Sequence, residues 1–174
     1  MIRKILRSGD AKLRVVSRPV AGLDKKVAAI IQDLKDTLII QKDPEGVGLA
    51  APQIGKNLRI FVINHLGVQR VIINPKILKS TNAAVTKKAK KETIMEGCLS
   101  LPNYYGDLKR ASLVKIKYLN EEGKEAIEVF DGLYAQIVLH EIDHLEGKLF
   151  IDRLLEQKQP LYKLNKGEWE EVEL

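Results

Sequence analysis

Residues 131–147 read DGLYAQIVLHEIDHLEG, and this stretch predicts a single helix. Asp131 suits an N-cap, and Gly147 suits the position just past a helix end. The apolar residues occupy more than one face of this helix: Leu133, Ala135, Ile137, Val138, Leu139, Ile142 and Leu145. A helix that is apolar on several faces is surrounded by protein, so we expect it to be central and buried.

The same helix carries the pattern His140-Glu141-Ile142-Asp143-His144. Two histidines four residues apart lie on one helical face, where both rings can bind a single metal ion. The alternative is that they are packing histidines satisfied by hydrogen bonds. Two imidazoles and a carboxylate in an apolar helix would then be costly buried groups, whereas a metal removes that cost. The pattern therefore predicts a metal site.

A third metal ligand is needed, because a catalytic zinc-type site combines three protein ligands with a water molecule. Cys98, the one cysteine of the chain, lies in residues 96–102, which read EGCLSLP. Gly97 and Pro102 suit a tight backbone path that brings the thiolate to the helix. Taken alone, a single cysteine is more often a small buried hydrophobe. Beside the histidine pair, we expect Cys98 to bind the metal.

The length and composition bound the class of protein. A chain of 174 residues with 45% hydrophobic content can build one sizeable core, so we expect a single domain over residues 1–174. The apolar run at residues 38–40 is far shorter than the ~20 residues that a membrane span requires. The N-terminus lacks the apolar stretch of a secretory signal. A single cysteine cannot form an internal disulfide, so a reducing, cytoplasmic location is expected.

Hydrophobic periodicity predicts the remaining elements. Apolar residues at helical spacing predict an amphipathic helix over residues 24–41, with Asp24 as its N-cap. Strands are predicted at residues 59–64, 71–74, 113–119 and 126–130, and a short last strand within 167–174. The expected fold is therefore α+β, with mixed or antiparallel sheets packed around the buried helix that carries the two histidines.

The net charge of +6 favours anionic partners, but this signal is weak. Its densest part is residues 87–91, KKAKK, which we interpret as a solvated loop or hairpin tip. The alternative is contact with an anionic surface such as ribosomal RNA. Few aromatic residues accompany the lysines, so no specific nucleic acid sequence is expected as a partner.

Three separated motifs resemble the signature boxes of the peptide deformylase family. They are residues 46–53 (GVGLAAPQ), 96–100 (EGCLS) and 140–145 (HEIDHL), and they follow the family order. A looser similarity runs from residue 5 to about residue 153. The chain departs from the family pattern at Ala11, where a proline commonly follows Gly-Asp, and at Leu139, where a glutamine commonly precedes the first histidine. Neither departure touches a catalytic group.

This resemblance implies an activity, a cofactor and partners. The family is a group of metal-dependent hydrolases that remove the N-formyl group from the formyl-methionine of newly synthesised polypeptides and release formate. It implies one divalent ion, with Fe²⁺ as the working ion and Zn²⁺, Ni²⁺ or Co²⁺ as substitutes. The implied partners are the nascent formyl-Met peptide and the ribosome surface near the exit tunnel.

The resemblance also implies a role for each site residue. Cys98, His140 and His144 would hold the metal, while Glu141 would move a proton between the attacking water and the leaving amine. The Gln53 side chain and the Leu99 backbone N–H would stabilise the oxyanion. The substrate peptide would add as a strand along Val47 and Gly48. A pocket for the methionine side chain would be bordered by Val47, Leu133, Gln136, Ile137 and the His140 ring.

Three alternatives are less consistent with these residues. A zinc endopeptidase shares the H-E-x-x-H pattern, but Cys98 disfavours it. A non-catalytic ribosome-binding module would need neither Glu141 nor Gln53. A phosphate-binding loop at residues 46–48 lacks the Lys-Ser/Thr of a Walker A motif. The third histidine, His65, is expected in a loop away from the site.

Overall fold

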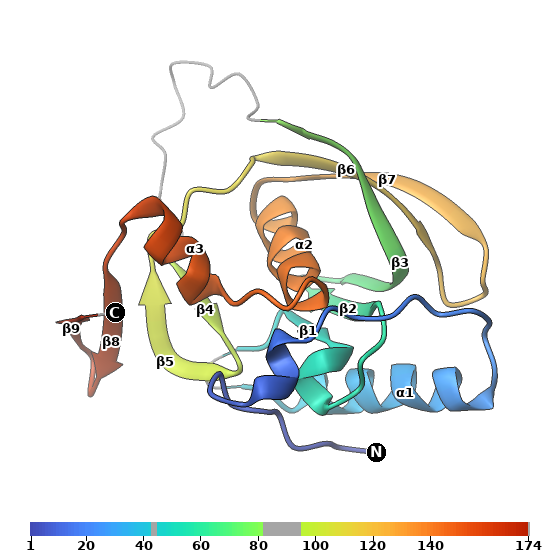
Figure 1. Cartoon of the computed structure of the whole chain (residues 1–174), viewed down its shortest axis with the longest axis horizontal. Helices are drawn as coiled ribbons and strands as arrows, with labels where there is room; N and C mark the ends of the chain where they lie inside the picture. Colours follow the sequence, from blue (N-terminus) through green and yellow to red (C-terminus); the bar gives the residue numbers. More distant parts are fainter. Residues whose placement is uncertain (43–44, 82–94, 174) are drawn as a thin grey trace.

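The structure is a computed structural model, and it describes residues 1–42, 45–81 and 95–173. It contains two antiparallel sheets (Figure 1). The five-stranded sheet has the order β1-β2-β3-β6-β7, with strands Gly48–Ala50, Ile60–His65, Val68–Thr81, Leu113–Leu119 and Glu125–Asp131. The four-stranded sheet has the order β4-β5-β8-β9, with strands Glu96–Cys98, Leu101–Gly106, Leu161–Asn165 and Glu168–Val172. The prediction of an α+β fold with antiparallel sheets is confirmed.

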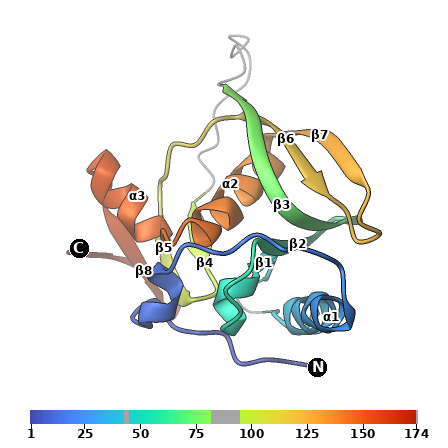
Figure 2. The ribbon, with the colours of Figure 1, turned by 45° about the vertical axis from the view of Figure 1, so that its right-hand side comes forward.

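Helix α2, Gly132–Leu145, runs through the middle of the molecule, and β3, β6 and β7 curve over it (Figures 1 and 2). Its apolar side chains join the inner face of the five-stranded sheet in one core, which includes Phe61, Ile72, Ile116, Val138 and Leu145. The helix follows Asp131, as predicted, and Gly147 lies past its end with a φ of +71°. A polar pair of histidines is thus surrounded by hydrocarbon.

Helix α1, Lys25–Ile39, covers the outer side of β1 and β2. The Asp24 carboxylate accepts a hydrogen bond from the Val27 N–H, which confirms the predicted N-cap. The apolar stripe of α1 packs on a second core, which contains Ile31, Leu34, Leu38, Ile60 and Ile73. This core anchors β1, the strand that borders the site.

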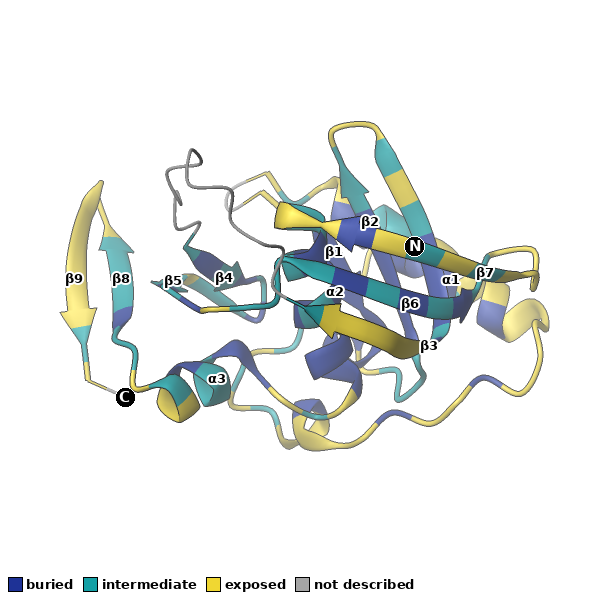
Figure 3. Cartoon of the chain, turned by 90° about the horizontal axis from the view of Figure 1, so that it is seen from above, coloured by how far each residue is buried: buried dark blue, intermediate teal, exposed yellow. Residues whose placement is uncertain are grey.

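Helix α3, Phe150–Gln157, covers one face of the four-stranded sheet. Phe150 and Leu154 pack with Leu161 and Cys98 in a third, smaller core. Figure 3 shows the burial changing from the dark interior of the larger sheet to the exposed strand β9. The packing of α3 is therefore one of the contacts that hold the smaller sheet.

The N-terminal segment connects the two sheets. The Leu6 N–H donates to the Gln53 carbonyl at 2.8 Å, and the Ser8 N–H donates to the Ser100 carbonyl at 2.9 Å. Gln53 belongs to the short 3-10 helix η2, Ala51–Ile54, whereas Ser100 lies in the turn between β4 and β5. A second 3-10 helix, η1, spans Ala11–Arg14. The backbone of residues 6–8, here called the N-terminal strap, thus fixes two loops of the site relative to each other.

The sequence predictions succeeded best for periodic segments. The strand over residues 113–119 coincides with β6, and the strands over 59–64, 126–130 and 167–174 overlap β2, β7 and β9. The strand over 71–74 is part of the much longer β3, and β1, α3, β4, β5 and β8 were not predicted. The lysine cluster at residues 87–91 lies outside the described residues. Within the described residues, no helix is long and apolar enough to span a membrane.

We predict that Asn74→Ala lowers the free energy of unfolding by about 1–3 kcal/mol. The Asn74 side chain accepts from the Val20 N–H and donates to the Val20 carbonyl, both at 2.8 Å, and its backbone has a φ of +51°. Alanine loses both hydrogen bonds and strains the left-handed backbone. Urea unfolding measures the change. Asn103→Ala is the control, because Asn103 has a φ of +67° but an exposed side chain. Equal losses in the two variants would contradict a role for the Val20 hydrogen bonds.

Candidate metal centre and active site

Three potential metal ligands meet where α2 passes β4. One donor atom from each of Cys98, His140 and His144 lies within 4.8 Å of the others, and all three residues are buried. The Cys98 Sγ lies 3.3 Å from the His144 Nε2. The two rings, one helical turn apart, stack edge to face at 4.9 Å between centroids. The structure therefore brings together the thiol and both imidazoles named from the sequence.

The donor set fits a divalent transition metal. One thiolate and two imidazoles are ligands that Zn²⁺ and Fe²⁺ accept, and three protein ligands leave a position for water or substrate. Burial by itself raises the pKa of the Cys98 thiol, but the neighbouring His144 and His140 hold that pKa well below its usual value. The thiolate is thus the favoured form, and it is the form that binds metals.

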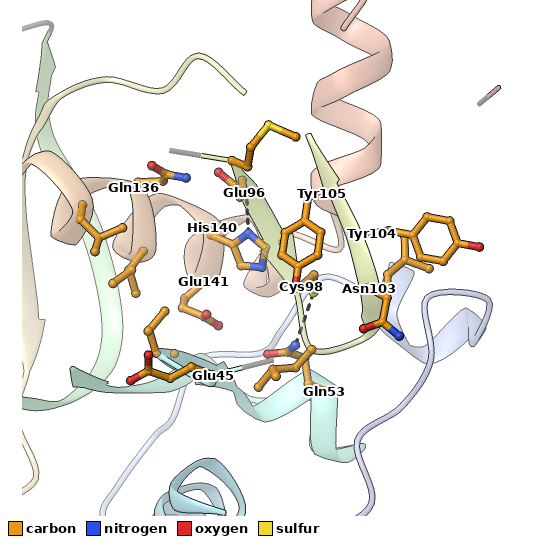
Figure 4. Close-up of a pocket in the computed structure, with 18 residues that line it drawn as sticks. Glu45, Gln53, Glu96, Cys98, Asn103, Tyr104, Tyr105, Gln136, His140 and Glu141 are labelled. Atoms are coloured by element: carbon orange, nitrogen blue, oxygen red, sulfur yellow. Dashed lines mark hydrogen bonds and ion pairs between the residues drawn. The ribbon is translucent and has the colours of Figure 1, made fainter. Parts of the chain in front are cut away.

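A buried charge network orients His140. The His140 Nδ1 lies 2.7 Å from the Glu96 Oε1, which leaves Nε2 as the nitrogen available to a metal (Figure 4). Both Glu96 oxygens also accept hydrogen bonds from Arg110, at 2.6 and 2.7 Å. Although burial raises the pKa of Glu96, Arg110 and His140 lower it to about 2. Glu96 therefore stays ionised and fixes the ring, as carboxylates commonly do beside metal-binding histidines.

The same network continues to α3. Arg110 donates to the Asp143 Oδ2 at 2.9 Å, and Arg153 donates to both oxygens of Asp143 at 3.1 and 2.7 Å. Asp143 projects from α2, Arg110 follows β5 and Arg153 lies on α3. A chain of charge-assisted hydrogen bonds thus joins three segments around the candidate metal centre.

Glu141 differs from these paired carboxylates. It is 4% exposed, and its Oε2 has no hydrogen-bond partner within the described chain. Burial raises its pKa to about 7, although His140 and His144 act in the opposite direction. A methyl group built on Gly48 would lie 2.5 Å from the Glu141 Oε1, so only glycine leaves room for the carboxylate there. The carboxylate points into the pocket beside the ligand cluster (Figure 4).

Gln53 is held by η2 with its amide directed at the cluster. Its Oε1 accepts from the Ala50 N–H at 2.8 Å, which fixes the orientation of the side chain. Its Nε2 donates to the Ser100 Oγ at 3.2 Å and lies 3.7 Å from the Cys98 Sγ. The amide is buried, at 1% exposure, rather than on the surface. A fixed N–H donor beside a metal ligand suits the stabilisation of a developing negative charge.

A cavity of about 220 Å³ opens over this cluster. Its lining includes every residue named from the sequence for substrate or oxyanion contact: Val47, Gly48, Gln53, Leu99, Leu133, Gln136 and Ile137. His140, Glu141 and Cys98 also line it. Strands β1 and β4 border it, and each is the end strand of its sheet. An extended peptide can therefore enter between two strand edges.

The residues of the charge network that orients His140 were not identified from the sequence. Glu96 and Asp143 lie within the quoted motifs, but no role was assigned to them, and Arg110 was not singled out. Acidic residues on an apolar helix were the available signal, because each needs a buried cation. The prediction for His65 was wrong in part: it ends β2 rather than lying in a loop, and its carbonyl accepts from the Tyr134 hydroxyl at 3.0 Å. It is not part of the ligand cluster.

An α+β fold with a buried thiolate, two imidazoles and an unpaired carboxylate in one pocket is typical of a mononuclear metal hydrolase. The model of the polypeptide deformylase family matches residues 2–160. A peptide deformylase of Pseudothermotoga lettingae is 43% identical over 87% of this chain and 82% of its own length. Peptide deformylase 1 of Clostridium acetobutylicum is 41% identical over 90% of this chain and 97% of its own length.

A solved structure supports membership of the same family. The crystal structure of a peptide deformylase from Legionella pneumophila superposes with a TM-score of 0.77 at 41% identity, over 88% of this chain and 86% of that one. The chain belongs to the polypeptide deformylase family. The family match ends at residue 160, just before β8.

We predict that Glu96→Gln weakens metal binding by about 10- to 100-fold, because an amide holds the His140 ring less firmly than a carboxylate. Competition with a chromogenic chelator measures the affinity. Glu156→Gln is the matched control, since Glu156 is an exposed partner of Arg153 at the far end of the network. Unchanged affinity in Glu96→Gln would contradict the orienting role.

Proposed function

We propose that this protein is a metal-dependent peptide deformylase that hydrolyses the formamide bond of N-terminal formyl-methionine in nascent polypeptides. The observation that carries the proposal is the unpaired carboxylate of Glu141 beside the Cys98, His140 and His144 cluster, in a pocket bordered by strand edges. Membership of the deformylase family supports the same substrate. We keep the expectation of one catalytic domain, residues 1–174, in the cytoplasm.

The metal ion would contribute Lewis-acid chemistry. When bound by Cys98, His140 and His144, a divalent ion lowers the pKa of a coordinated water and polarises a carbonyl oxygen. The protein supplies the remaining requirements: a base, an oxyanion site and a fixed substrate.

Glu141 handles the proton. As the water oxygen attacks the formyl carbon, the carboxylate takes the proton from that water. When the C–N bond breaks, the same proton passes to the leaving amine nitrogen. The products are formate and a free N-terminal methionine. A buried carboxylate with a pKa near 7 suits both directions of this transfer.

Gln53 and Leu99 complete the oxyanion site. The tetrahedral intermediate places negative charge on the former formyl oxygen, which needs donors aimed at it beforehand. The Gln53 amide is held by the Ala50 N–H and Ser100, so its N–H group requires little reorganisation. We assign the second donor to the Leu99 backbone N–H, because Leu99 follows Cys98 and lines the same cavity.

The strand edges and apolar walls position the peptide. Backbone pairing along Val47 and Gly48 would align the substrate as an added strand beside β1. Leu133 and Ile137 come from the first turns of α2 and offer hydrocarbon walls to the methionine side chain, and Gln136 lies between them. A small pocket beside the ligand cluster thus selects a long, unbranched apolar residue.

Neither alternative from the sequence is supported by the relatives, which carry the name peptide deformylase. A zinc endopeptidase and a non-catalytic ribosome-binding module are therefore set aside. Contact with the ribosome surface near the exit tunnel remains part of our proposal for the catalytic protein, because the substrate emerges there. The net charge of +6 is consistent with such an anionic partner.

We predict that the wild-type protein releases formate from a formyl-Met peptide without cleaving the unformylated peptide. Glu141→Gln should keep its metal but lower turnover by roughly 10²-fold or more, because an amide cannot accept the proton. Formate assays and metal analysis on the same samples separate the two effects. Near-normal turnover in Glu141→Gln would remove Glu141 from the proton step, and cleavage of the unformylated peptide would refute the assigned reaction.

For the ion, we propose Fe²⁺ as the working metal, with Ni²⁺ or Co²⁺ as effective substitutes. Affinity alone places Zn²⁺ above Fe²⁺ at such a site, so protein purified in air should contain zinc or a mixture. After chelation and anaerobic reloading, we predict higher formate release with Fe²⁺ than with Zn²⁺. Air should inactivate the Fe²⁺ form, because the metal and the Cys98 thiolate can both oxidise. Full activity with Zn²⁺ and none with Fe²⁺ would overturn this assignment.

A further inference from the structure

The C-terminal hairpin lies beyond the residues that the family model matches. The hairpin formed by β8 and β9 begins at Leu161, whereas the match to the family model ends at residue 160. The hairpin extends the four-stranded sheet outward from β5, so β9 forms its outer edge (Figure 3). An extension of a sheet that borders the active site can extend the substrate-facing surface as well.

The strand register shows which face the hairpin adds to. Gly97 pairs with Tyr105, Tyr105 with Tyr162, and Tyr162 with Glu171, so these residues share one face of the sheet. Trp169 lies two residues before Glu171 and is on the same face. Gly97 and Tyr105 line the active-site cavity. The hairpin therefore extends the sheet face that forms part of the wall of that cavity.

The opposite face of the sheet is used for packing. Leu161 pairs with Gly106, and both belong to the face that meets α3. Leu161 is buried with Leu154 and Phe150 in the third core. This packing holds the hairpin in place, while the opposite face carries Trp169, which remains partly exposed.

Trp169 is the most prominent group on the extended wall. Its ring packs edge to face on Tyr105, with 5.4 Å between centroids and an interplanar angle of 84°. Trp169 nevertheless remains 53% exposed. Its contact with Tyr105 fixes the indole beside the cavity while most of its surface stays open. An indole held in this way is a platform for a cation or a planar side chain.

The charges near this platform are negative. Residues 161–173 contain four glutamates against two lysines, and within strand β9 it is Glu171 that faces the same side as Trp169, because Glu168 and Glu170 alternate to the opposite face. Glu171 shares the face of Trp169, whereas Lys163 lies on the opposite face over the Tyr104 ring. Across the cavity, the Glu45 side chain is 71% exposed and also borders the opening. An acidic rim on a chain of net charge +6 is a local feature that favours cationic ligands.

We propose that Trp169 and Glu171 form a distal subsite that binds an arginine or lysine side chain of the substrate peptide, downstream of its formyl-methionine. This proposal rests on the proposed deformylase function and adds a preference for part of the nascent chain. The guanidinium of arginine can stack on the indole while it pairs with the Glu171 carboxylate. Arginine should therefore be preferred over lysine.

The proposal is tested with formyl-Met tetrapeptides that carry Ala, Arg, Lys or Glu at the second, third or fourth position. For wild type we expect kcat/KM to be roughly three- to tenfold higher with Arg than with Ala at one of these positions. Trp169→Ala and Glu171→Gln should bring this ratio towards one, and Glu171→Lys should invert it in favour of Glu. Glu168→Gln is the matched control, because Glu168 is in the same strand on the opposite face. It should leave the ratio unchanged.

A binding measurement is independent of catalysis. Trp169 is the only tryptophan of the chain, so intrinsic fluorescence reports on the subsite directly. Titration of wild type with the unformylated peptide Met-Ala-Arg-Ala, and with its Arg isomers, should change the emission more than Met-Ala-Ala-Ala does. About 1 M salt should weaken the effect, because screening then acts within about 3 Å.

The outcomes distinguish a failure of the subsite proposal from a failure of the proposed deformylase activity. Absence of formate release from every peptide would refute the deformylase function. Formate release with equal kcat/KM for Arg, Ala and Glu peptides would overturn the subsite alone. An equal fall for all peptides in Trp169→Ala, with the ratio preserved, would show that the ring only supports the sheet. Glu171→Gln, which keeps the strand pairing, decides the case if Trp169→Ala does not fold.

Discussion

The pairing of buried charges around α2 fixes the geometry of this protein. A helix that is apolar on most sides carries His140, Glu141, Asp143 and His144, all buried. Leaving such groups without partners would cost several kcal/mol each. The partners of His140 and Asp143 come from outside the helix, chiefly Glu96 and Arg110. Because these contacts form in only one relative placement, they set the position of the small sheet on the helix and bring Cys98 to the histidines.

Each of the two sheets leaves one strand edge at the site. Strands β1 and β4 each end a sheet, and unpaired strand edges are prone to pairing with other chains. Here both edges are short, and they line a cavity between α2 and the strand β5. The N-terminal strap holds the loops behind them through the carbonyls of Gln53 and Ser100. The protein can therefore keep open edges for a substrate peptide without exposing a long, flat strand.

The sequence predicted what depends on local periodicity and on motif chemistry. The helix over residues 131–147, the N-cap Asp24 and the strand over 113–119 follow from patterns within a few residues. The candidate metal ligands Cys98, His140 and His144 follow from residue types that commonly bind metal ions, and the structure brings their donor atoms together. The β4–β5 hairpin was harder to predict, because its strands are short and interrupted by a bulge and their partner β8 is distant in sequence. Arg110 was missed for a related reason: nothing within its own segment indicates that it reaches Glu96 and Asp143.

Hydrogen-bond satisfaction separates the structural carboxylates from the one assigned to chemistry. Glu96 and Asp143 are buried, and each is bound by arginine, so their pKa values fall despite burial. Glu141 lies two residues before Asp143 on α2, yet one of its oxygens lacks a partner in the described chain, and burial raises its pKa to about 7. A third arginine there would have stabilised the fold but would have held the carboxylate in its ionised form. Leaving this one group unpaired costs stability, and it is the feature on which we base the proposed role of Glu141 as the group that accepts and returns a proton.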